Sequence, residues 1–562
     1  MARKDYSVWS KEELIKKVKA LEKRKKYGIV WEDKPEQVAD LCKEKLPVLE
    51  EDKGREIKTN ESKPINIIIE GDNYHALSVL NYTHKGKVDV IYIDPPYNTG
   101  NKSWKYNNDY VDTEDSFRHS KWLSFMEKRL KLAKTLLKRN GVLICTIDEN
   151  EHATLGVLLQ EIFQNKEIVC VTILHNPGGI QGQNFSYCHE YAYFVHPRKG
   201  TYISKIKRED VPLTAFRDWG KESSKREAAK NCFYPIYVKN EKVIGFGEVS
   251  SENFHPKVSN ITRKDGIVEI YPIDQNGVER KWRFSRQSVE EIQTELIVKK
   301  VKNEFVVFRE KKDYRWKTVW TDTKYNANVY GTKLVNNIID TAFPFPKSLY
   351  AVMDSIRAII HNKHNAVILD FFAGSGTTGH AVMELNKQDG GNRKFILCTN
   401  NEDNNGDGTK IATDILYPRI RNVIRGYTGI RDKKDYKGLG GNLKYYKTGF
   451  VDAEPTDKNK RDLVDKSTEM LCLREDCFDE VKKGKEFRIF KDSKDKHLGI
   501  IYDDEGIEAF KSEAKKTKKK FVVYVFSLDD STREEEFKDV RKLVELKPIP
   551  AVILNVYKRI FK

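Results

Sequence analysis

Cysteine is scarce and scattered in this sequence of 562 residues, and no two of its eight cysteines form a C-x-x-C pair. Structural zinc sites and disulfide frameworks both depend on clustered or regularly spaced cysteines. Cys145, Cys170 and Cys398 lie inside apolar runs, where a free cysteine behaves as a small hydrophobic residue. The sequence therefore predicts no metal site and no disulfide, and a reducing, cytoplasmic location is expected.

Long apolar runs are also missing. No stretch approaches the roughly 20 residues that a membrane-spanning helix needs. The first residues, MARKDYSVWSKEELIKK, are charged rather than apolar. We therefore expect neither a membrane anchor nor a signal peptide. The phosphate-binding pattern G-x-x-x-x-G-K-[S/T] is absent as well, so the sequence predicts no ATPase or helicase motor of its own.

Positive charge, by contrast, is abundant. Lysine plus arginine number 101 against 84 for aspartate plus glutamate, which gives a formal charge of +17 and a pI of about 9.1. Such a surplus favours a polyanionic partner, although a merely lysine-rich surface is the alternative. Between about 198 and 335, basic residues are interleaved with aromatic ones, as in RKWRFSRQ. This composition suits contacts with nucleic acid, and the alternative is a charged insertion on an enzyme.

The run Asp94-Pro95-Pro96-Tyr97 follows the apolar stretch KVDVIYI. The β-branched and aromatic residues of that stretch predict a short strand that is buried on both faces. Two prolines then prevent strand or helix from continuing, because each fixes φ near about −65°. Pro95 precedes a proline and is therefore pushed to an extended conformation. Its carbonyl consequently has a fixed direction beside the Asp94 carboxylate.

This arrangement suits the activation of an amino group on a flat base. The Asp94 carboxylate and the Pro95 carbonyl offer two acceptors for the two hydrogens of an –NH2 group, which localises the nitrogen lone pair. Tyr97 offers a ring on which the base can stack. The alternative is a plain turn after a strand, since Asp, Pro and Tyr are all common in turns. A second site is needed to decide between them.

That second site is the run DFFAGSGTTG, which leads from a predicted strand into a predicted helix. Gly374 and Gly376 permit a tight turn and a close approach of the backbone to a ligand. The helix behind them begins with free N–H groups. Glu402 follows the next predicted strand and can bind ribose hydroxyls, a role that Asn400 or Asn401 can share. The pattern predicts a cofactor that contains a nucleoside, bound on a Rossmann-like unit.

Two cofactor classes compete for this unit. A dinucleotide explains the glycine loop but leaves the Asp94 turn without a role. S-adenosylmethionine explains both sites, because its adenosine fits the ribose acid while its methyl group faces an amine held by Asp94. The sequence therefore favours S-adenosylmethionine.

Together these motifs resemble those of the β-class amino-methyltransferases of DNA. In that class the catalytic motif precedes the cofactor motif, and a target-recognition region lies between them, which is the order found here. Several further segments are most similar to the modification (Mod) subunits of type III restriction–modification systems: KYGIVWE, IIIEGDNYHAL, VIYIDPPYNTGN, RHSKWLSFMEKRLKLAK, FPFPKSL, LDFFAGSGTTGHAV, GNLKYYKT and KPIPAVILNVYKRIFK.

The resemblance implies a site-specific methyltransferase that acts on the N6 amine of an adenine flipped out of duplex DNA. It assigns the target-base site to Asp94, Pro95, Pro96 and Tyr97. It assigns cofactor binding to a larger set: Asp72, Phe345, Lys347, Asp370, Phe372, Ala373, Gly374, Gly376, Thr377 and Glu402. It also implies a homodimer and a separate restriction (Res) subunit with helicase and nuclease activity.

The expected fold class is α/β: a Rossmann-like methyltransferase fold with circularly permuted motif order, an inserted target-recognition region and a separate C-terminal α/β domain. The predicted division is an N-terminal helical arm (1–62), a catalytic half (63–197), the target-recognition region (198–335), a cofactor half (336–440) and a C-terminal domain (441–562) for dimerisation or partner docking.

Three alternatives to adenine methylation stay open. An N4-cytosine methyltransferase would have the same site. Only the residue before P-P-Y favours adenine, because Asp rather than Ser at this position tends to accompany adenine methylation in the class. A non-catalytic DNA-specificity subunit would not need both motifs intact. An NAD(P)-dependent oxidoreductase shares only the glycine loop.

Overall fold

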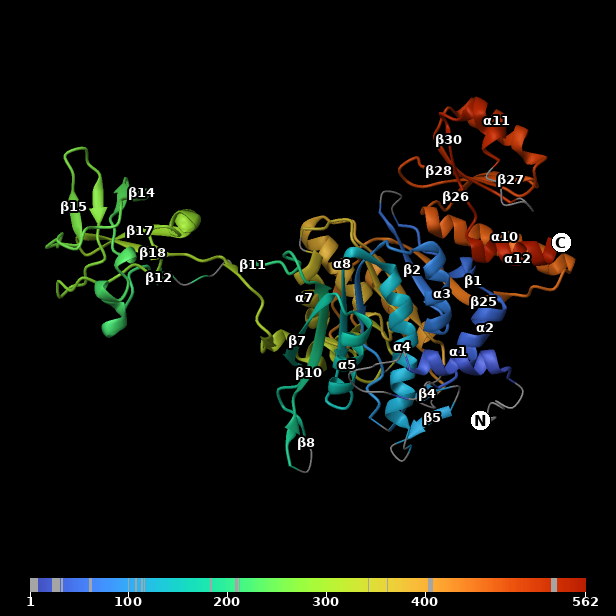
Figure 1. Cartoon of the computed structure of the whole chain (residues 1–562), viewed down its shortest axis with the longest axis horizontal. Coiled ribbons are helices and arrows are strands. Elements are labelled where there is room, and N and C mark those ends of the chain that lie inside the picture. The colour runs from blue at the N-terminus through green and yellow to red at the C-terminus, as the bar shows by residue number, and fades with distance from the viewer. Residues whose placement is uncertain are drawn as a thin grey trace. The chain divides into compact units, whose positions relative to one another are not determined.

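The structure is a computed structural model of the chain. It describes residues 9–22, 31, 34–59, 63–99, 101–106, 109–112, 115, 117–181, 184–207, 211, 213–341, 343–360, 362–402, 408–526 and 533–561. Contacts within the chain define two units, one of residues 1–203 with 317–562 and the other of residues 204–316. Figure 1 shows the elements of both units.

A ten-stranded sheet forms the centre of the first unit. Its strands lie in the order β1 (Leu46–Glu51), β25 (Asn442–Val451), β2 (Ile65–Glu70), β22 (Lys394–Thr399), β21 (Val367–Asp370), β3 (Val88–Ile93), β6 (Leu137–Ile147), β10 (His189–Pro197), β7 (Lys166–Leu174) and β20 (Val319–Trp320). The strands from β25 to β6 all run parallel. β1 and β10 are antiparallel to their neighbours.

Strand β3 shows why this centre forms. Every residue of VDVIYI is buried, as the near-continuous apolar run predicts. The one charged residue, Asp89, is tolerated because it accepts hydrogen bonds from Lys138 (2.6 Å) and from the backbone N–H of Val367 (3.0 Å). The predicted α/β, Rossmann-like class is confirmed. The sheet is mixed rather than wholly parallel, because a hairpin instead of a crossover helix connects β7 to β10.

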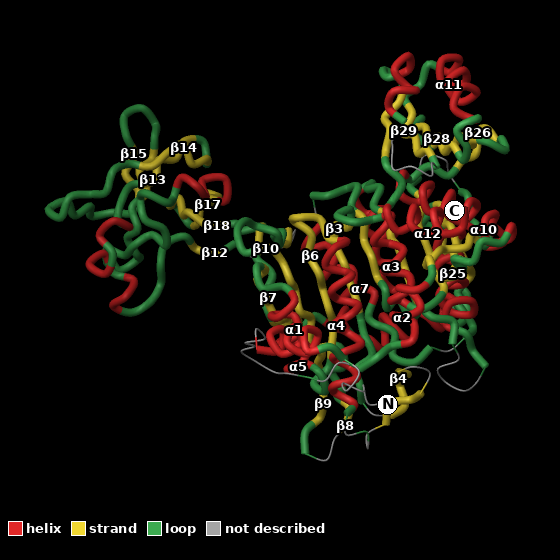
Figure 2. Tube along the Cα trace, turned by 45° about the vertical axis from the view of Figure 1, so that its right-hand side comes forward, coloured by secondary structure: helices red, strands yellow, loops and turns green. Residues whose placement is uncertain are grey.

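Helices cover both faces of the sheet (Figure 2). One layer packs together α2 (Gln37–Glu44), α3 (Asn73–Thr83), α4 (Arg118–Leu136), α5 (His152–Ile162) and α10 (Asp457–Glu475). The other contains α6 (Lys333–Ile338), α7 (Leu349–Ile360), α8 (Thr377–Asp389) and α9 (Tyr417–Arg425). The layers lie on opposite faces because the β2–α3–β3 and β21–α8–β22 crossovers run in opposite directions along the sheet. None of the described helices combines the length and apolar character that crossing a bilayer requires.

Residues 204–316 form the second unit, which lies within the predicted target-recognition region (198–335). Its strands are β11 (Ile206–Lys207), β12 (Thr214–Ala215), β13 (Ile236–Lys239), β14 (Lys242–Phe246), β15 (Asn260–Thr262), β16 (Val268–Ile270), β17 (Leu296–Val301), β18 (Glu304–Arg309) and β19 (Asp313–Tyr314). All their pairings are antiparallel, in sheets ordered β12-β18-β17 and β14-β13-β16-β15 and a β11-β19 pair. Trp282 and Tyr234 lie in a core of their own.

The C-terminal residues form a five-stranded sheet of β26 (Asp479–Lys483), β27 (Phe487–Lys491), β28 (His497–Ile501), β29 (Phe521–Val525) and β30 (Val544–Lys547), with helices α11 (Gly506–Thr517) and α12 (Ala551–Phe561). The boundary predicted at 441 differs from this arrangement, because β25 belongs to the central sheet. The predicted N-terminal arm likewise contains α1 (Lys11–Glu22) and α2 but also strand β1 of the central sheet. Sequence pattern predicts a strand without saying which sheet it joins.

Short hairpins complete the described elements. They are β4 (Asn101–Tyr106) with β5 (Asp109–Asp112), β8 (Ile180–Gln181) with β9 (Ser186–Tyr187), and β23 (Gly426–Thr428) with β24 (Asp435–Lys437). A π-helical turn of residues Ile411–Leu416 directly precedes α9.

Candidate active site

The loops after four adjacent parallel strands meet at one edge of the central sheet. Each carries an acidic residue: Asp72 after β2, Glu402 after β22, Asp370 at the end of β21 and Asp94 after β3. Parallel strands expose their carboxyl ends at the same edge, so these loops border one crevice. Because β3 pairs directly with β21, the Asp94 turn and the glycine loop are neighbours despite their distance in the sequence.

Two contacts hold the turn that follows β3. The indole N–H of Trp122 on α4 donates to the carbonyl of Pro96 (2.7 Å). Asn98 adopts φ = 55°, which asparagine tolerates better than most residues, and its amide donates to Glu151 (2.5 Å). The Pro96 carbonyl is therefore occupied, and the role of second acceptor for an amine stays predicted for the carbonyl of Pro95.

Three donors approach the same carboxylate oxygen of Asp94. The hydroxyls of Tyr97 and Thr146 each donate to Oδ1 at 2.8 Å, and Nζ of Lys347 lies 3.2 Å from it. Among the described residues no side chain donates a hydrogen bond to Oδ2. Burial raises the pKa of Asp94, and the attraction of Lys347 offsets this rise only in part.

Glu190 of β10 is a member of this cluster that the sequence analysis missed. Its side chain is buried, and its Oε2 accepts from Nζ of Lys347 and from the hydroxyl of Tyr97 (3.2 Å). Burial alone would raise the pKa of Glu190, but the attraction of Lys347 brings it below its usual value. A glutamate inside the apolar run EYAYFV was the available signal, because a charge in a buried strand needs a partner.

The glycine loop packs tightly in front of α8. Gly374 (φ = 47°) and Gly376 (φ = 82°) both occupy the left-handed region, where glycine is favoured. A Cβ on Gly376 would lie 2.5 Å from Leu416 Cδ1. Asp370 accepts from the Phe372 N–H (2.9 Å) and from the Thr378 hydroxyl (2.6 Å), and burial raises its pKa to about 7. Asp370 thus braces the loop from inside.

A buried guanidinium supports the same loop from behind. Arg419 of α9 donates to the Ser375 carbonyl (3.2 Å) and hydroxyl (3.0 Å) and to the Thr377 hydroxyl (2.9 Å). Burial lowers the pKa of Arg419 to about 9. Nothing in the sequence around Arg419 indicated this role, since its partners lie about 40 residues earlier, in the glycine loop and at the start of α8.

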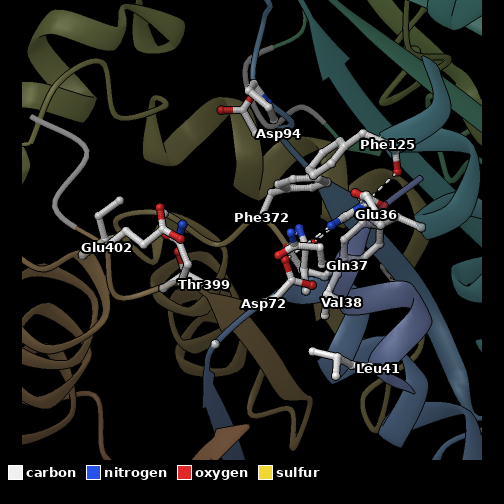
Figure 3. A pocket seen from close by; sticks show the side chains of 18 of the residues that line it. Glu36, Gln37, Val38, Leu41, Asp72, Asp94, Phe125, Phe372, Thr399 and Glu402 are labelled. Carbon is white, nitrogen blue, oxygen red and sulfur yellow. Dashed lines mark hydrogen bonds and ion pairs between the residues drawn. The ribbon is translucent and has the colours of Figure 1, made fainter. Parts of the chain in front are cut away.

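A cavity of about 510 Å³ lies between the Asp94 turn and the glycine loop, within the range of roughly 300–1,000 Å³ that is usual for small-molecule sites. Its lining brings together several of the predicted residues: Asp72, Asp94, Pro96, Phe372, Gly374 and Glu402. In Figure 3 the rings of Phe372 and Phe125 lie between Asp94 and the group of Asp72 and Gln37, with Glu402 and Thr399 to one side.

The N-terminal region supplies another wall of this cavity, which the sequence analysis did not foresee. Gln37, Val38 and Leu41 of α2 and the residue before them, Glu36, line it. Glu36 accepts from the fully buried Arg129 (2.8 and 3.1 Å). Arg129 also lies 3.4 Å from the carboxylate of Asp72, so one guanidinium joins α2 to the loop after β2.

Other predicted cofactor residues lie elsewhere. Four of them belong to the glycine loop and do not line the cavity: Asp370, Ala373, Gly376 and Thr377. The side chains of Asp370, Ala373 and Thr377 are buried. Phe345 was predicted to bind the cofactor, but its side chain is 89% exposed. Phe343 lines the cavity instead. The backbone at Phe345 has φ = 52°, in the left-handed region.

Two further predictions concern the same walls. Lys347 lies against Asp94 and Glu190 instead of in the predicted cofactor wall. In the loop after β22, Glu402 and Asn400 line the cavity. Asn401 turns away, donating to Glu70 (3.1 Å) and accepting from the backbone N–H of Thr413 (3.1 Å). Within the part of the chain that the structure describes, no group of three His, Cys, Asp or Glu side chains could hold a metal ion.

The sequence also matches a known family across this region. Residues 88–437, more than half of the chain, match the family described as DNA methylase (N6_N4_Mtase). The chain belongs to this DNA methylase family. Its membership confirms the prediction of a DNA methyltransferase, an enzyme that acts on DNA, and decides against the oxidoreductase alternative.

Individual relatives agree with the family. The chain is 32% identical over 391 residues to the type II methyltransferase M.KpnI of Klebsiella pneumoniae, covering 65% of this chain and 89% of that one. It is 27% identical over 482 residues to the EcoPI Mod subunit, a type III restriction–modification enzyme of Escherichia phage P1, covering 75% and 72%. A solved structure of an M1.HpyAVI–SAM complex shares 12% identity with a TM-score of 0.29 and covers 63% of this chain and 98% of that one.

Proposed function

We propose that this DNA methyltransferase transfers the methyl group of S-adenosylmethionine to the N6 amine of an adenine flipped out of duplex DNA, as the modification subunit of a type III-like restriction–modification system. One observation carries the proposal. The carboxylate of Asp94 borders the same cavity as the glycine loop, so a base amine and a methyl donor can meet there without either leaving its own site.

The residues that line the cavity fit S-adenosylmethionine. Glu402, at one end, suits ribose hydroxyls, and the backbone at Gly374 allows close approach because no side chain intervenes. Phe372 offers an apolar face, and Asp72 offers a carboxylate near the opposite wall. When bound, the cofactor supplies a methyl group that is already activated by its sulfonium, so the protein contributes mainly positioning.

Asp94 and the Pro95 carbonyl orient the amine of the target base. Oδ1 of Asp94 is taken up by Tyr97, Thr146 and Lys347, so Oδ2 is the oxygen that accepts an amine hydrogen and, after transfer, the departing proton. The Tyr97 hydroxyl is held by Asp94 and Glu190, which fixes its ring for stacking. The base must leave the duplex because its amine cannot otherwise reach a buried donor.

The partners follow from the relatives and the charge. The surplus of +17 suits duplex DNA, and residues 204–316 are the described unit that we assign to reading the target sequence. Several relatives are Mod subunits of type III enzymes, so a Res subunit is the proposed restriction partner. A homodimer and a cytoplasmic location stay predictions.

The experiment is labelled methyl transfer from S-adenosylmethionine to genomic DNA of a host that lacks this protein, followed by sequencing that detects modified bases. N6-methyladenine at one short sequence is expected, whereas N4-methylcytosine would favour the alternative base. Asp94→Ala should lower transfer by at least about 100-fold because it removes the acceptor, while leaving the Kd for the cofactor nearly unchanged. Asp465→Ala, an exposed acid on α10, is the matched control. Retained transfer by the Asp94 variant would refute the assignment.

A further inference from the structure

The cluster behind Asp94 contains two carboxylates and one ammonium. Nζ of Lys347 contacts Oε2 of Glu190 and lies 3.2 Å from Oδ1 of Asp94. The side chain of Glu190 is 3% exposed and that of Lys347 is 12% exposed. Glu190 comes from β10 and Lys347 from the segment before α7, so the long-range fold brings both to the turn after β3.

Several neighbouring titratable groups are neutral and add nothing to this charge count. His175, whose Nδ1 lies 4.0 Å from Glu190, has a pKa lowered first by burial and stays neutral. Burial likewise raises the pKa of each of the neighbouring groups Tyr92, Tyr97 and Cys145, which therefore stay neutral. Two further carboxyls interact with the cluster, Asp370 with Asp94 and Asp148 with Lys347. Burial raises their pKa values to about 7 and about 6, so they titrate near neutral pH and are not included in this count.

The lysine matters because the buried carboxylate of Glu190 and the partly exposed carboxylate of Asp94 lie on either side of it and repel each other's charge. Without a cation between them, the pKa of one of the two rises, so that it takes up a proton at a higher pH. A protonated Asp94 would no longer be a pure acceptor. Lys347 removes this conflict, since it lies between the two carboxylates and cancels the charge of one.

We propose that Glu190 and Lys347 are positioning residues that set the charge of the target-base site, Lys347 cancelling Glu190 so that Asp94 faces the amine with the single net negative charge. This inference rests on the proposed function. Lys347 also occupies Oδ1 together with Tyr97 and Thr146. The pair thereby selects Oδ2 as the oxygen that is open to the amine.

The chemistry of transfer needs that one negative charge. The nitrogen lone pair forms the bond to the methyl carbon, while the electron pair of the breaking carbon–sulfur bond stays on sulfur, which becomes a neutral thioether. The amine is cationic until one proton leaves it for Oδ2 of Asp94 and then solvent. A site with a net charge of minus one stabilises the positive charge as it develops on the amine.

The test compares Lys347→Met, Glu190→Gln and the double variant by the pH dependence of kcat for methyl transfer to genomic DNA. Lys347→Met should move the acid limb of the profile up by about 1–3 pH units, because a carboxylate next to a cation has its pKa lowered by that amount. Glu190→Gln should move it down, because the repulsion that raises the pKa of Asp94 is removed. The double variant restores a net charge of minus one and should return the limb close to its wild-type position.

Opposite shifts with recovery in the double variant are the signature of charge cancellation. Both single variants moving the limb the same way, or a double variant no better than Lys347→Met, would overturn the proposal. Should Lys347→Met fail to fold, the other two variants still decide, since their shifts are predicted separately. Lys138→Met, which removes a similar contact to a buried carboxylate (Asp89, 2.6 Å) away from the site, should leave the profile unchanged. A wild-type protein without any transfer would contradict the proposed function rather than this inference.

Discussion

Replacing Gly376 with alanine tests whether the tight loop before α8 governs both stability and cofactor binding. A left-handed backbone costs an L-residue about 1–2 kcal/mol. The new Cβ would also lie 2.5 Å from Leu416 Cδ1 and 3.3 Å from Ile420 Cδ1, both in the core. Overpacking of this kind costs about 1–3 kcal/mol. The expected loss is therefore about 2–5 kcal/mol.

The other end of the same helix provides the control. Gly390 caps α8 with φ = 69°, and a Cβ there would meet nothing within 4 Å. Gly390→Ala should therefore lose only the backbone part, about 1–2 kcal/mol. The difference between the two variants isolates the packing cost at Gly376.

Hydrogen exchange of the amides of α8 measures the free energy of local opening, and calorimetric titration measures the Kd for S-adenosylmethionine. The free energy of local opening should fall by about 1–3 kcal/mol more in Gly376→Ala than in Gly390→Ala. Gly376→Ala should also bind the cofactor at least about tenfold more weakly, because a loss of about 1.4 kcal/mol in binding free energy raises the Kd tenfold. Equal losses in the two variants, with unchanged cofactor affinity, would refute the reasoning.

Three further predictions concern buried charges and the cofactor wall. Burial raises the pKa of Asp370 to about 7, so the folded protein holds a proton that the unfolded chain releases near pH 4. The free energy of unfolding should therefore fall as the pH rises from about 4 to about 7. Asp370→Asn should remove this part of the fall, as measured by urea titrations at several pH values. Arg129→Met should destabilise the fold by about 3–5 kcal/mol because it strands Glu36, whereas adding Glu36→Gln should recover much of the loss; an equally unstable double variant would contradict the ion-pair explanation. Glu402→Gln should raise the Kd for S-adenosylmethionine by about tenfold or more, as expected for a hydrogen bond to a charged group, and an unchanged Kd would remove Glu402 from the ribose site.

The local chemistry of the motifs was predictable from the sequence. Pro95 and Pro96 stop the strand, Gly374 and Gly376 adopt left-handed φ, and β3 covers the apolar run that predicts it. These features depend on residues close together in the chain. Their physical causes therefore act before any tertiary contact forms.

Features that depend on distant partners were not predictable. Lys347 was expected in the cofactor wall, but its ammonium follows the charges of Asp94 and Glu190, which come from other strands. Phe345 was expected beside it, but its side chain is exposed, at a residue with a positive φ. No pattern in the sequence predicted that α2 forms a wall of the cavity, because the buried Arg129 that anchors this wall belongs to α4. Burial of charge is decided by tertiary pairing, which a single sequence does not encode in any local pattern.

The order of strands in the central sheet has a consequence for how the chain folds during synthesis. β2 and β3 follow each other in the sequence, yet β22 and β21 lie between them in the sheet. Until residues beyond 399 have left the ribosome, both β2 and β3 present an unpaired edge on the side where the missing strands will insert. Such late, long-range closure is slow and leaves apolar edges open to aggregation. A chain cut before β21 should therefore accumulate as insoluble protein, even though it contains the complete Asp94 turn.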